Sequence, residues 1–371
     1  MVYKNLGTVT KEYLPDLRWA NPRNSEGAFL TLKDGRILFV YSRFKGESCA
    51  DAATADIYMS ISADDGNHFD EGKLVFTCEG EQAVNIMSLS LMRMNNGDIG
   101  LFYLVRTTYT QLQMFLRRSA DEGKTWGERV LCTNQDGFFV VNNDRVTRLS
   151  NGRILIPVAV HRTGWKDNAA SGENYFDSNS DVIFFYSDDD GFHWCCSSTR
   201  VCNPFGKPVC HSGLQEPGVL ELENGVIWGW ARTDLGRQFE MFSMDYGDTW
   251  TTCQPSRFTA PNSPLSMKRD GDAIYAIWNP VPEYNGRDIN IGAFTGGRTP
   301  YVIAVSRDGG RTFSAPIAFE DDENRGYCYC AMHFTEQALL LAYCAGSVED
   351  GGCLNRLRIR RIPLTQLMEI Q

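Results

Sequence analysis

Long apolar runs are missing from this chain of 371 residues. No stretch of 18 apolar residues occurs, so the sequence predicts no membrane-spanning helix. Residues 1–7 lack the apolar core of a signal peptide, from which we expect a cytoplasmic protein. Low-complexity segments and runs of like charge are absent too. The net charge of −10 disfavours nucleic acid and anionic membranes as partners.

The sequence also lacks the cysteine and histidine patterns of a metal site. No C-x-x-C occurs among the 12 cysteines, and the five histidines are dispersed, so we expect no zinc site and no cofactor. Cys195 is adjacent to Cys196, while Cys328 and Cys330 alternate within a strand-like run. This placement favours reduced, mostly buried thiols over a disulfide framework.

Helix signals are scarce, and the sequence contains repetition instead. An octamer S-x-D-x-G-x-x-[W/F] occurs five times, beginning at Ser62, Ser119, Ser187, Ser243 and Ser306. The aspartate can accept hydrogen bonds from backbone N–H groups of a turn, and the glycine can take a positive φ. A strand-like stretch precedes each octamer. Each octamer is therefore predicted to be a turn between two antiparallel strands.

A second repeat lies upstream of each octamer. Asp-Gly or Asn-Gly stands beside an apolar run at residues 34–35, 96–97, 151–152, 224–225 and 270–271. These dipeptides are strong hairpin signals, and two hairpins make the four strands of a propeller blade. A sixth unit runs from Cys330 to Ile362 without an octamer, and residues 7–14 are expected to close it. The sequence thus predicts an all-β fold, one six-bladed β-propeller domain over residues 1–371.

Charged and polar residues recur at the ends of these predicted strands, where the blades of a propeller meet. They are Arg23, Asp51, Asn143, Arg145, Glu216, Arg232, Arg298, Tyr327 and Tyr329. Arginines gathered at one mouth of an acidic protein predict an anion-binding site. We therefore expect a small-molecule or oligosaccharide substrate that is anionic, while the sequence leaves the oligomeric state open.

The octamers, the six units and the order Arg, Asp, Glu, Arg, Arg, Tyr resemble the sialidase superfamily, whose octamers are known as Asp-boxes. The resemblance covers nearly the whole chain. It implies a triad of Arg23, Arg232 and Arg298 that grips a sugar carboxylate. It further implies Asp51 as acid and base, with Asp56 and Asp144 as alternatives, Glu216 as the residue that polarises the nucleophile, and Tyr329 as that nucleophile, with Tyr327 as its alternate.

A tyrosine nucleophile suits a substrate that carries a carboxylate at the anomeric carbon. A carboxylate nucleophile would meet like-charge repulsion of about 1–4 kcal/mol at 4 Å, which a neutral phenol avoids. The phenol, with a pKa of about 10, needs a neighbouring carboxylate to take its proton. Asn143 and Arg145 lie in a polar segment without a known counterpart in sialidases, and we expect both to contact the substrate.

Three functions from different classes fit these residues. The first is an exo-glycosidase of sialidase type that removes a terminal, acidic sugar with retention; the sugar is sialic acid or another nonulosonic acid. The second is a polysaccharide lyase, or another hydrolase on the same scaffold. The third is a carbohydrate-binding propeller without catalysis. The concentration of arginine, glutamate and tyrosine at strand ends favours an enzyme, and fold analogy alone does not choose among the three.

Overall fold

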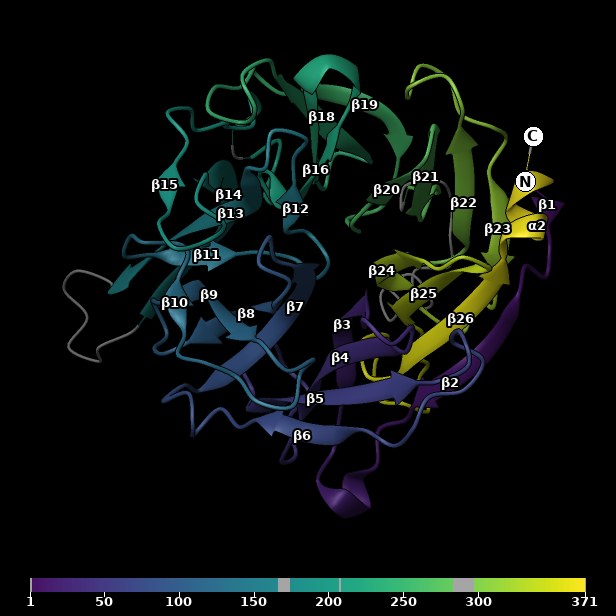
Figure 1. Ribbon diagram of the computed structural model, residues 1–371. Coiled ribbons are helices and arrows are strands. Elements are labelled where there is room, and N and C mark those ends of the chain that lie inside the picture. The colour runs from purple at the N-terminus through teal and green to yellow at the C-terminus, as the bar shows by residue number, and fades with distance from the viewer. Residues whose placement is uncertain (1, 166–173, 207, 283–296, 371) are drawn as a thin grey trace.

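Six β-sheet units surround a central axis in the computed structural model, which describes residues 2–165, 174–206, 208–282 and 297–370 (Figure 1). The predicted all-β propeller is confirmed. Helical structure in the described residues is limited to the 3₁₀ turns η1 (Leu17–Trp19) and η2 (Glu223–Gly225) and the short helix α2 (Leu364–Met368). In each blade the first strand lies nearest the axis (Figure 1).

The first three blades come from the N-terminal half of the chain. Their strands are β3 (Asn24–Thr31), β4 (Ile37–Phe44), β5 (Ala55–Ser62) and β6 (Lys73–Phe76) in the first blade, β7 (Asn85–Arg93), β8 (Ile99–Arg106), β9 (Leu112–Ser119) and β10 (Val130–Leu131) in the second, and β12 (Thr147–Arg148), β13 (Ile154–Trp165), β14 (Asn174–Ser187) and β15 (Cys195–Cys196) in the third. A bridging strand, β11 (Phe138–Val140), pairs with both β9 and β13, so the second and third blades form one nine-stranded sheet.

The remaining blades follow the same antiparallel order. Their strands are β16 (Gln215–Glu221), β17 (Ile227–Arg232), β18 (Arg237–Ser243) and β19 (Gln254–Thr259) in the fourth, β20 (Ser266–Asp270), β21 (Ala273–Trp278), β22 (Tyr301–Ser306) and β23 (Ile317–Glu320) in the fifth, and β24 (Cys328–Phe334), β25 (Ala338–Cys344) and β26 (Leu357–Pro363) in the sixth.

The N-terminal segment closes the ring, as residues 7–14 were expected to do. Strand β2 (Thr8–Tyr13) pairs antiparallel with β26 and supplies the outer strand of the sixth blade. The preceding β1 (Val2–Tyr3) pairs parallel with β23 of the fifth blade. Both ends of the chain consequently lie at the outer edge of neighbouring blades (Figure 1).

Each octamer forms the predicted turn between the third and fourth strands of its blade. In the first, Ser62 Oγ accepts the Gly66 N–H at 2.9 Å and Asp64 Oδ1 accepts the His68 N–H at 2.8 Å. Gly66 has a φ of 82°, a left-handed value that a β-carbon disfavours. The same serine-to-glycine bond recurs in the other four octamers. The aspartate of each octamer therefore satisfies backbone donors of the turn.

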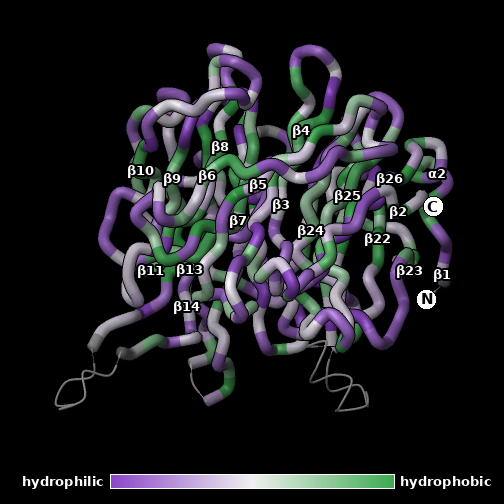
Figure 2. Tube along the Cα trace, turned by 90° about the horizontal axis from the view of Figure 1, so that it is seen from below, coloured by the Kyte–Doolittle hydropathy of each residue, from purple (hydrophilic) through white to green (hydrophobic). Residues whose placement is uncertain are grey.

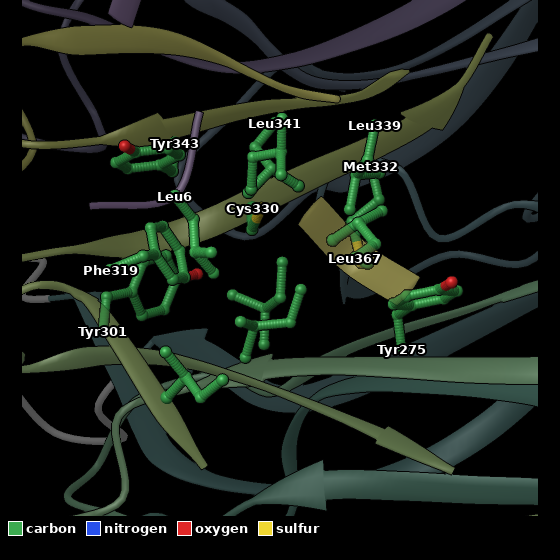
Figure 3. Close-up of a cluster of buried hydrophobic side chains, with 14 of the residues drawn as sticks. Leu6, Tyr275, Tyr301, Phe319, Cys330, Met332, Leu339, Leu341, Tyr343 and Leu367 are labelled. Carbon is green, nitrogen blue, oxygen red and sulfur yellow. The ribbon is translucent and has the colours of Figure 1, made fainter. Parts of the chain in front are cut away.

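Apolar residues of the strands pack between neighbouring blades, whereas hydrophilic residues dominate the loops (Figure 2). Between the fifth and sixth blades, Phe319, Tyr343 and Leu341 belong to one buried cluster that also holds Leu6 and Leu367 (Figure 3). Such clusters fix the blades relative to one another, which in turn fixes the ends of the inner strands. Within the described residues, no helix is both long enough and apolar enough to cross a membrane.

Candidate active site

A cavity of about 460 Å³ opens at the end of the axis where the inner strands begin. Its polar lining comes from five blades and includes Glu26, Asp51, Ser88, Arg106, His161, Gln215, Glu216, Arg232 and Tyr329. Pocket volumes of this order hold small molecules such as a single sugar. The ring arrangement thus brings together residues that are as far apart in the sequence as 26 and 329.

A shared backbone feature aims side chains into this cavity. Glu26, Ser88, Glu216 and Tyr329 have left-handed φ values between 48° and 59°, and each lies in a bulge near the start of an inner strand. A left-handed residue other than glycine costs about 1 kcal/mol or more and persists only where the surroundings hold it. The bulge interrupts the strand's alternation, so that its residue faces the axis instead of a neighbouring blade.

Glu216, Tyr329 and Arg232 form the centre of the site. Tyr329 Oη donates to Glu216 Oε1 at 2.9 Å, and Arg232 Nη1 donates to Glu216 Oε2 at 2.7 Å. Arg232 also reaches Tyr329 Oη at 3.3 Å and is held by Gln215 Oε1. Burial, together with the charge of Glu216, raises the pKa of the Tyr329 phenol well above its usual value. The phenol is therefore neutral at physiological pH and hydrogen-bonded to a base.

Arg298 covers the same tyrosine from the other side. Its guanidinium carbon lies 5.3 Å from the centre of the Tyr329 ring, and its Nη1 is 3.1 Å from Cys328 Sγ. Arg298 precedes β22 in the fifth blade, and Tyr329 belongs to β24 in the sixth. Two arginines from different blades thus flank one phenol.

Arg23 enters from the first blade and is 1 % exposed. Its Nη1 lies 2.5 Å from Asp51 Oδ1 and its Nη2 lies 3.0 Å from Glu26 Oε1. The guanidinium also stacks on the Phe44 ring, 4.4 Å from its centre. Burial raises the pKa of the Glu26 carboxyl to about 7, although the charge of Arg23 opposes this shift. Glu26 Oε2 accepts the Ser88 hydroxyl at 2.6 Å.

Asp51 lies where the three arginines converge. Its side chain is 72 % exposed, on the loop between β4 and β5. Partial desolvation would raise its pKa, but the charges of Arg23, Arg298 and Arg232 lower it. Hydrogen bonds, ring contacts and mutual electrostatic effects place Arg23, Asp51, Glu216, Arg232, Arg298 and Tyr329 close together, and of these Asp51, Glu216, Arg232 and Tyr329 line the cavity.

Three residues expected at the site lie elsewhere. Tyr327 is fully buried in the core between the fifth and sixth blades, and its hydroxyl has no partner among the described residues. Asn143 Nδ2 donates to the carbonyls of Gly27 and Tyr329, and so supports the backbone behind the cavity. Arg145 lines a different cavity. Asn143 and Arg145 belong to the polar segment 142–145, and the sequence pattern did not fix the directions of its side chains.

The alternative acids Asp56 and Asp144 also lie outside this cavity. Asp144 is bound by Lys268 and by the backbone N–H of Met332. Asp56 accepts the Cys78 N–H and pairs with Lys45. Asp56, Cys78 and Glu79 have the donor atoms for a metal ion within 4.8 Å of one another, but the Lys45 ammonium binds both carboxylates and supplies the positive charge there.

Sequence reasoning missed Glu26, Ser88 and Arg106. Glu26 stands three residues after Arg23, and a carboxylate at that spacing on an inner strand was the available signal for an arginine partner. Arg106 ends β8 and lies over the rings of Tyr109 and Phe138, at 5.6 and 5.3 Å. Desolvation lowers the pKa of Arg106, and the side chain makes no ion pair within the described part of the chain. No sequence motif marked it.

An apolar wall completes the cavity opposite Asp51. It consists of Met87, Leu104, Leu112, Phe138, Val140 and Phe176. His161 stacks on Phe176 with ring centres 5.0 Å apart, and its Nδ1 lies 2.9 Å from the Asp177 carbonyl oxygen. Burial lowers the pKa of His161, so the ring is neutral. The cavity thus has a charged half and an apolar half.

The chain matches known proteins at two levels, in sequence and in fold. The model of the BNR repeat-like domain matches residues 51–341. The chain belongs to the BNR repeat-like family. A sialidase of Bacteroides fragilis (strain YCH46) is 25 % identical over 236 residues, which cover 59 % of this chain and 37 % of that relative. This BNR-repeat protein therefore matches little more than a third of the relative's length.

Solved sialidases share the fold of this BNR-repeat protein. Hadza microbial sialidase Hz136 superimposes with a TM-score of 0.69 at 16 % identity, over 94 % of this chain and 67 % of that protein. Trypanosoma rangeli sialidase, solved in complex with sialic acid, gives a TM-score of 0.68 at 16 % identity, over 99 % and 59 %. At such identities the likeness shows the fold, and with the family match it confirms the resemblance to the sialidase superfamily.

Proposed function

We propose that this protein is an exo-acting glycoside hydrolase of sialidase type, which removes a terminal acidic sugar with retention of anomeric configuration. The observation that carries the proposal is the hydrogen bond of 2.9 Å from Tyr329 Oη to Glu216 Oε1, with Arg232 bonded to the same carboxylate and the Arg298 guanidinium over the tyrosine ring. A neutral phenol paired with a carboxylate base is the nucleophile expected for a substrate that is itself a carboxylate.

Binding begins with the substrate carboxylate at Arg23, Arg232 and Arg298. Arg23 is held by Asp51 and Glu26 in the free protein, so an incoming carboxylate has to take the place of Asp51 on this guanidinium. Asp51 is on an exposed loop and can move away at small cost. Once separated from Arg23, its pKa rises toward the usual range, and the carboxyl can hold the proton that the leaving group needs.

The first chemical step then forms a covalent glycosyl-tyrosine. Glu216 takes the proton of Tyr329, whose oxygen attacks the anomeric carbon, while Asp51 gives a proton to the glycosidic oxygen as that bond breaks. In the second step Asp51 removes a proton from water, which attacks the same carbon. The carbon–tyrosine bond breaks, and Glu216 returns the proton to the phenolate. Two displacements at one carbon retain its configuration.

The proposal is tested by activity on a panel of aryl glycosides of sialic, other nonulosonic, uronic and neutral sugars. We expect release of aryl alcohol from a nonulosonic acid glycoside, with the retained anomer as the first product by NMR. An inverted product would contradict the tyrosine mechanism. A product that absorbs in the ultraviolet through a new C=C bond would indicate a lyase instead.

Two substitutions at the site test the assigned roles. Tyr329→Phe and Glu216→Gln are each expected to lower kcat by roughly 10³-fold or more, because each removes a participant in the covalent step. Tyr327→Phe is the matched control, since the Tyr327 hydroxyl is buried in the neighbouring core without a partner. Full activity of Tyr329→Phe, or equal losses in both tyrosine variants, would place the nucleophile elsewhere.

A further inference from the structure

A second cavity, of about 750 Å³, lies at the other end of the axis. Strand β16 orients the two cavities, because Glu216 at its start lines the first cavity and Glu221 at its end lines the second. Five residues of extended strand separate these positions by roughly 16 Å. The second cavity is therefore distinct from the proposed active site, and the inference drawn from it does not depend on the hydrolase proposal.

Positive charge predominates in the lining of this cavity. Arg145, Arg148, Lys268 and Arg269 face two carboxylates, Asp144 and Glu221. The protein as a whole carries a net charge of −10. A cavity lined by four cations is therefore opposite in charge to the protein as a whole. Apolar and aromatic side chains, including Trp230 and Met267, form the rest of the wall.

Two of the four cations already have carboxylate partners. Arg148 Nη2 pairs with Asp190 at 2.6 Å, and Lys268 pairs with Asp144 at 3.2 Å. Glu221 is bonded by the Ser150 N–H and hydroxyl. The lining carboxylates are thus engaged by other groups, and neither forms an ion pair with Arg145 or Arg269, although the charge of Asp144 acts on Arg145.

Arg145 and Arg269 make no ion pair within the part of the chain that the structure describes. Arg269 Nη2 reaches only the carbonyl oxygen of Glu221, at 3.3 Å. Arg145 Nη2 donates to the Leu265 carbonyl at 2.7 Å, and the guanidinium carbon lies 5.7 Å from the centre of the Trp230 ring. Its Nε is buried without a partner in the described residues.

The burial of Arg145 makes this arrangement costly. The residue is 4 % exposed, and a buried cation without a counter-ion loses several kcal/mol of solvation. Glu216, whose charge also acts on Arg145, pairs with Arg232 instead. A guanidinium group that lines a cavity and still has free N–H groups suits an anion with several oxygens, because such an anion can accept more than one hydrogen bond from it.

We propose that the second cavity is a binding site for a phosphate-type oxyanion, to which Arg145 and Arg269 supply positive charge and N–H donors. The occupant is inorganic phosphate or the phosphate group of a small metabolite. The volume accommodates either one, and the apolar wall beside Trp230 has room for the organic part of an ester.

Isothermal titration of the purified protein with inorganic phosphate at constant ionic strength tests the site. We expect binding of one phosphate per chain with a Kd on the order of 1 mM or tighter. Chloride at the same ionic strength is expected to compete at least 10-fold less well. Absence of saturable phosphate binding, or equal competition by chloride, would overturn the proposal. Glucose 6-phosphate binding as tightly as inorganic phosphate would support the site with a phosphorylated metabolite as its occupant. Rejection of the ester alongside phosphate binding would support it with the free ion.

Variants locate the binding within the cavity. Arg269→Gln, on the partly exposed end of β20, is expected to weaken phosphate binding by at least 10-fold, and Arg145→Lys by at least 5-fold because the fork is lost. Arg148→Gln is the matched control, since it removes one positive charge from the same cavity but one that Asp190 already neutralises. It is expected to change the Kd by less than 2-fold. Equal weakening by Arg269→Gln and Arg148→Gln would show a general charge effect and would overturn the assignment.

Discussion

The titratable carboxyl of Glu26 competes with the carboxylate of the proposed substrate for the guanidinium of Arg23. Its carboxyl lies 3.0 Å from Arg23, the most deeply buried of the three converging arginines. Burial raises the pKa of Glu26 to about 7. Below that pH the carboxyl is neutral and binds Arg23 weakly, and above it the anion holds Arg23 more tightly. The availability of Arg23 for a substrate carboxylate therefore falls as the pH rises.

This competition predicts a pH dependence of ligand affinity. The Kd of free sialic acid, or of the acidic sugar found active in the panel, is expected to rise several-fold between pH 6 and pH 8, as Glu26 ionises. Glu26→Gln is expected to flatten this dependence, because an amide stays neutral. Calorimetric titration at four pH values provides the measurement. Glu240→Gln is the control, since Glu240 has a raised pKa but lies on β18, outside the site. A pH slope that persists in Glu26→Gln would contradict the assignment.

The raised pKa of Glu26 in the folded protein also determines the direction in which stability changes with pH. A carboxyl whose pKa is raised on folding keeps its proton in the folded state while the unfolded chain loses it. Its contribution to the free energy of unfolding is therefore full below about pH 4.5 and decreases up to about pH 7. Glu26→Gln removes this decrease. Urea unfolding at pH 5 and pH 8 is expected to show a smaller stability difference in the variant than in the wild type.

Arg106 is the free cation on the apolar side of the proposed active site. It stacks over Tyr109 and Phe138, lines the cavity and makes no ion pair in the described ranges. A hydrogen bond to a charged group contributes about 1.5–3 kcal/mol, equivalent to roughly 10- to 100-fold in binding. Arg106→Leu is expected to raise KM by at least 10-fold with kcat changed less than 3-fold. Steady-state kinetics measure the two constants separately, and Arg43→Leu, outside the cavity, provides the control. An unchanged KM would exclude a substrate contact.

The types of the site residues and their order along the chain could be predicted from the sequence. The directions in which their side chains point could not. Arg23, Glu216, Arg232, Arg298 and Tyr329 were identified because family order follows blade order. Glu26 and Ser88 escaped notice because their orientation depends on left-handed bulges that the residue pattern does not encode. Tyr327 was expected at the site but lies in the core, although it is the same residue type as Tyr329 and only two residues before it.

At the scale of single elements, the octamer turns stabilise the fold through hydrogen bonds that their repeated serine and aspartate make. In the second octamer, Ser119 Oγ accepts the buried Gly123 N–H at 2.8 Å and donates to Asp121 at 2.9 Å. The serine is 1 % exposed, so its removal leaves a buried backbone donor unsatisfied. The repeated turn therefore stabilises the five blades that contain it.

Ser119→Ala is expected to lower the free energy of unfolding by about 1–2 kcal/mol, because an unpaired buried N–H group costs about that much. Activity per folded molecule is expected to remain unchanged, since the turn lies far from the cavity. Urea denaturation followed by tryptophan fluorescence measures the first effect. Ser198→Ala, at an exposed position with a weak bond of 3.4 Å, serves as the control and is expected to change stability by less than 0.5 kcal/mol. A loss of equal size in both variants would argue against the turn bond.

Strands and turns were the most predictable part of the fold. Two local signals, the octamer and the Asn-Gly or Asp-Gly hairpin, recur at nearly constant spacing, and each reports on a turn that is decided within a few residues. The bridging strand β11 was not predicted, because its pairing with both β9 and β13 depends on the position of two blades relative to each other.

At the scale of the whole molecule, the site depends on closure of the ring. Tyr329 comes from the sixth blade, whereas Arg23, Glu26 and Asp51 come from the first, so the site spans the seam between the two ends of the chain. The seam is held by β2, which pairs with β26, and by Tyr13, whose ring lies 4.4 Å from that of Tyr41 in the first blade. Arg360 Nη1 also donates to the Leu6 carbonyl.

Removal of residues 1–13 is therefore expected to impair stability and the site together. Burial of Leu6 and Tyr13 alone contributes about 2 kcal/mol each, and β26 would lose its ladder to β2, so the free energy of unfolding should fall by several kcal/mol. Removal of residues 1–3 is the control, because Val2 and Tyr3 are largely exposed. Urea unfolding and binding of the acidic sugar are measured on both forms. A form lacking residues 1–13 that unfolds at the wild-type urea concentration and binds the sugar equally well would show that the seam does not need β2. Concerted loss of stability and binding would tie the convergence of the arginines to closure of the propeller.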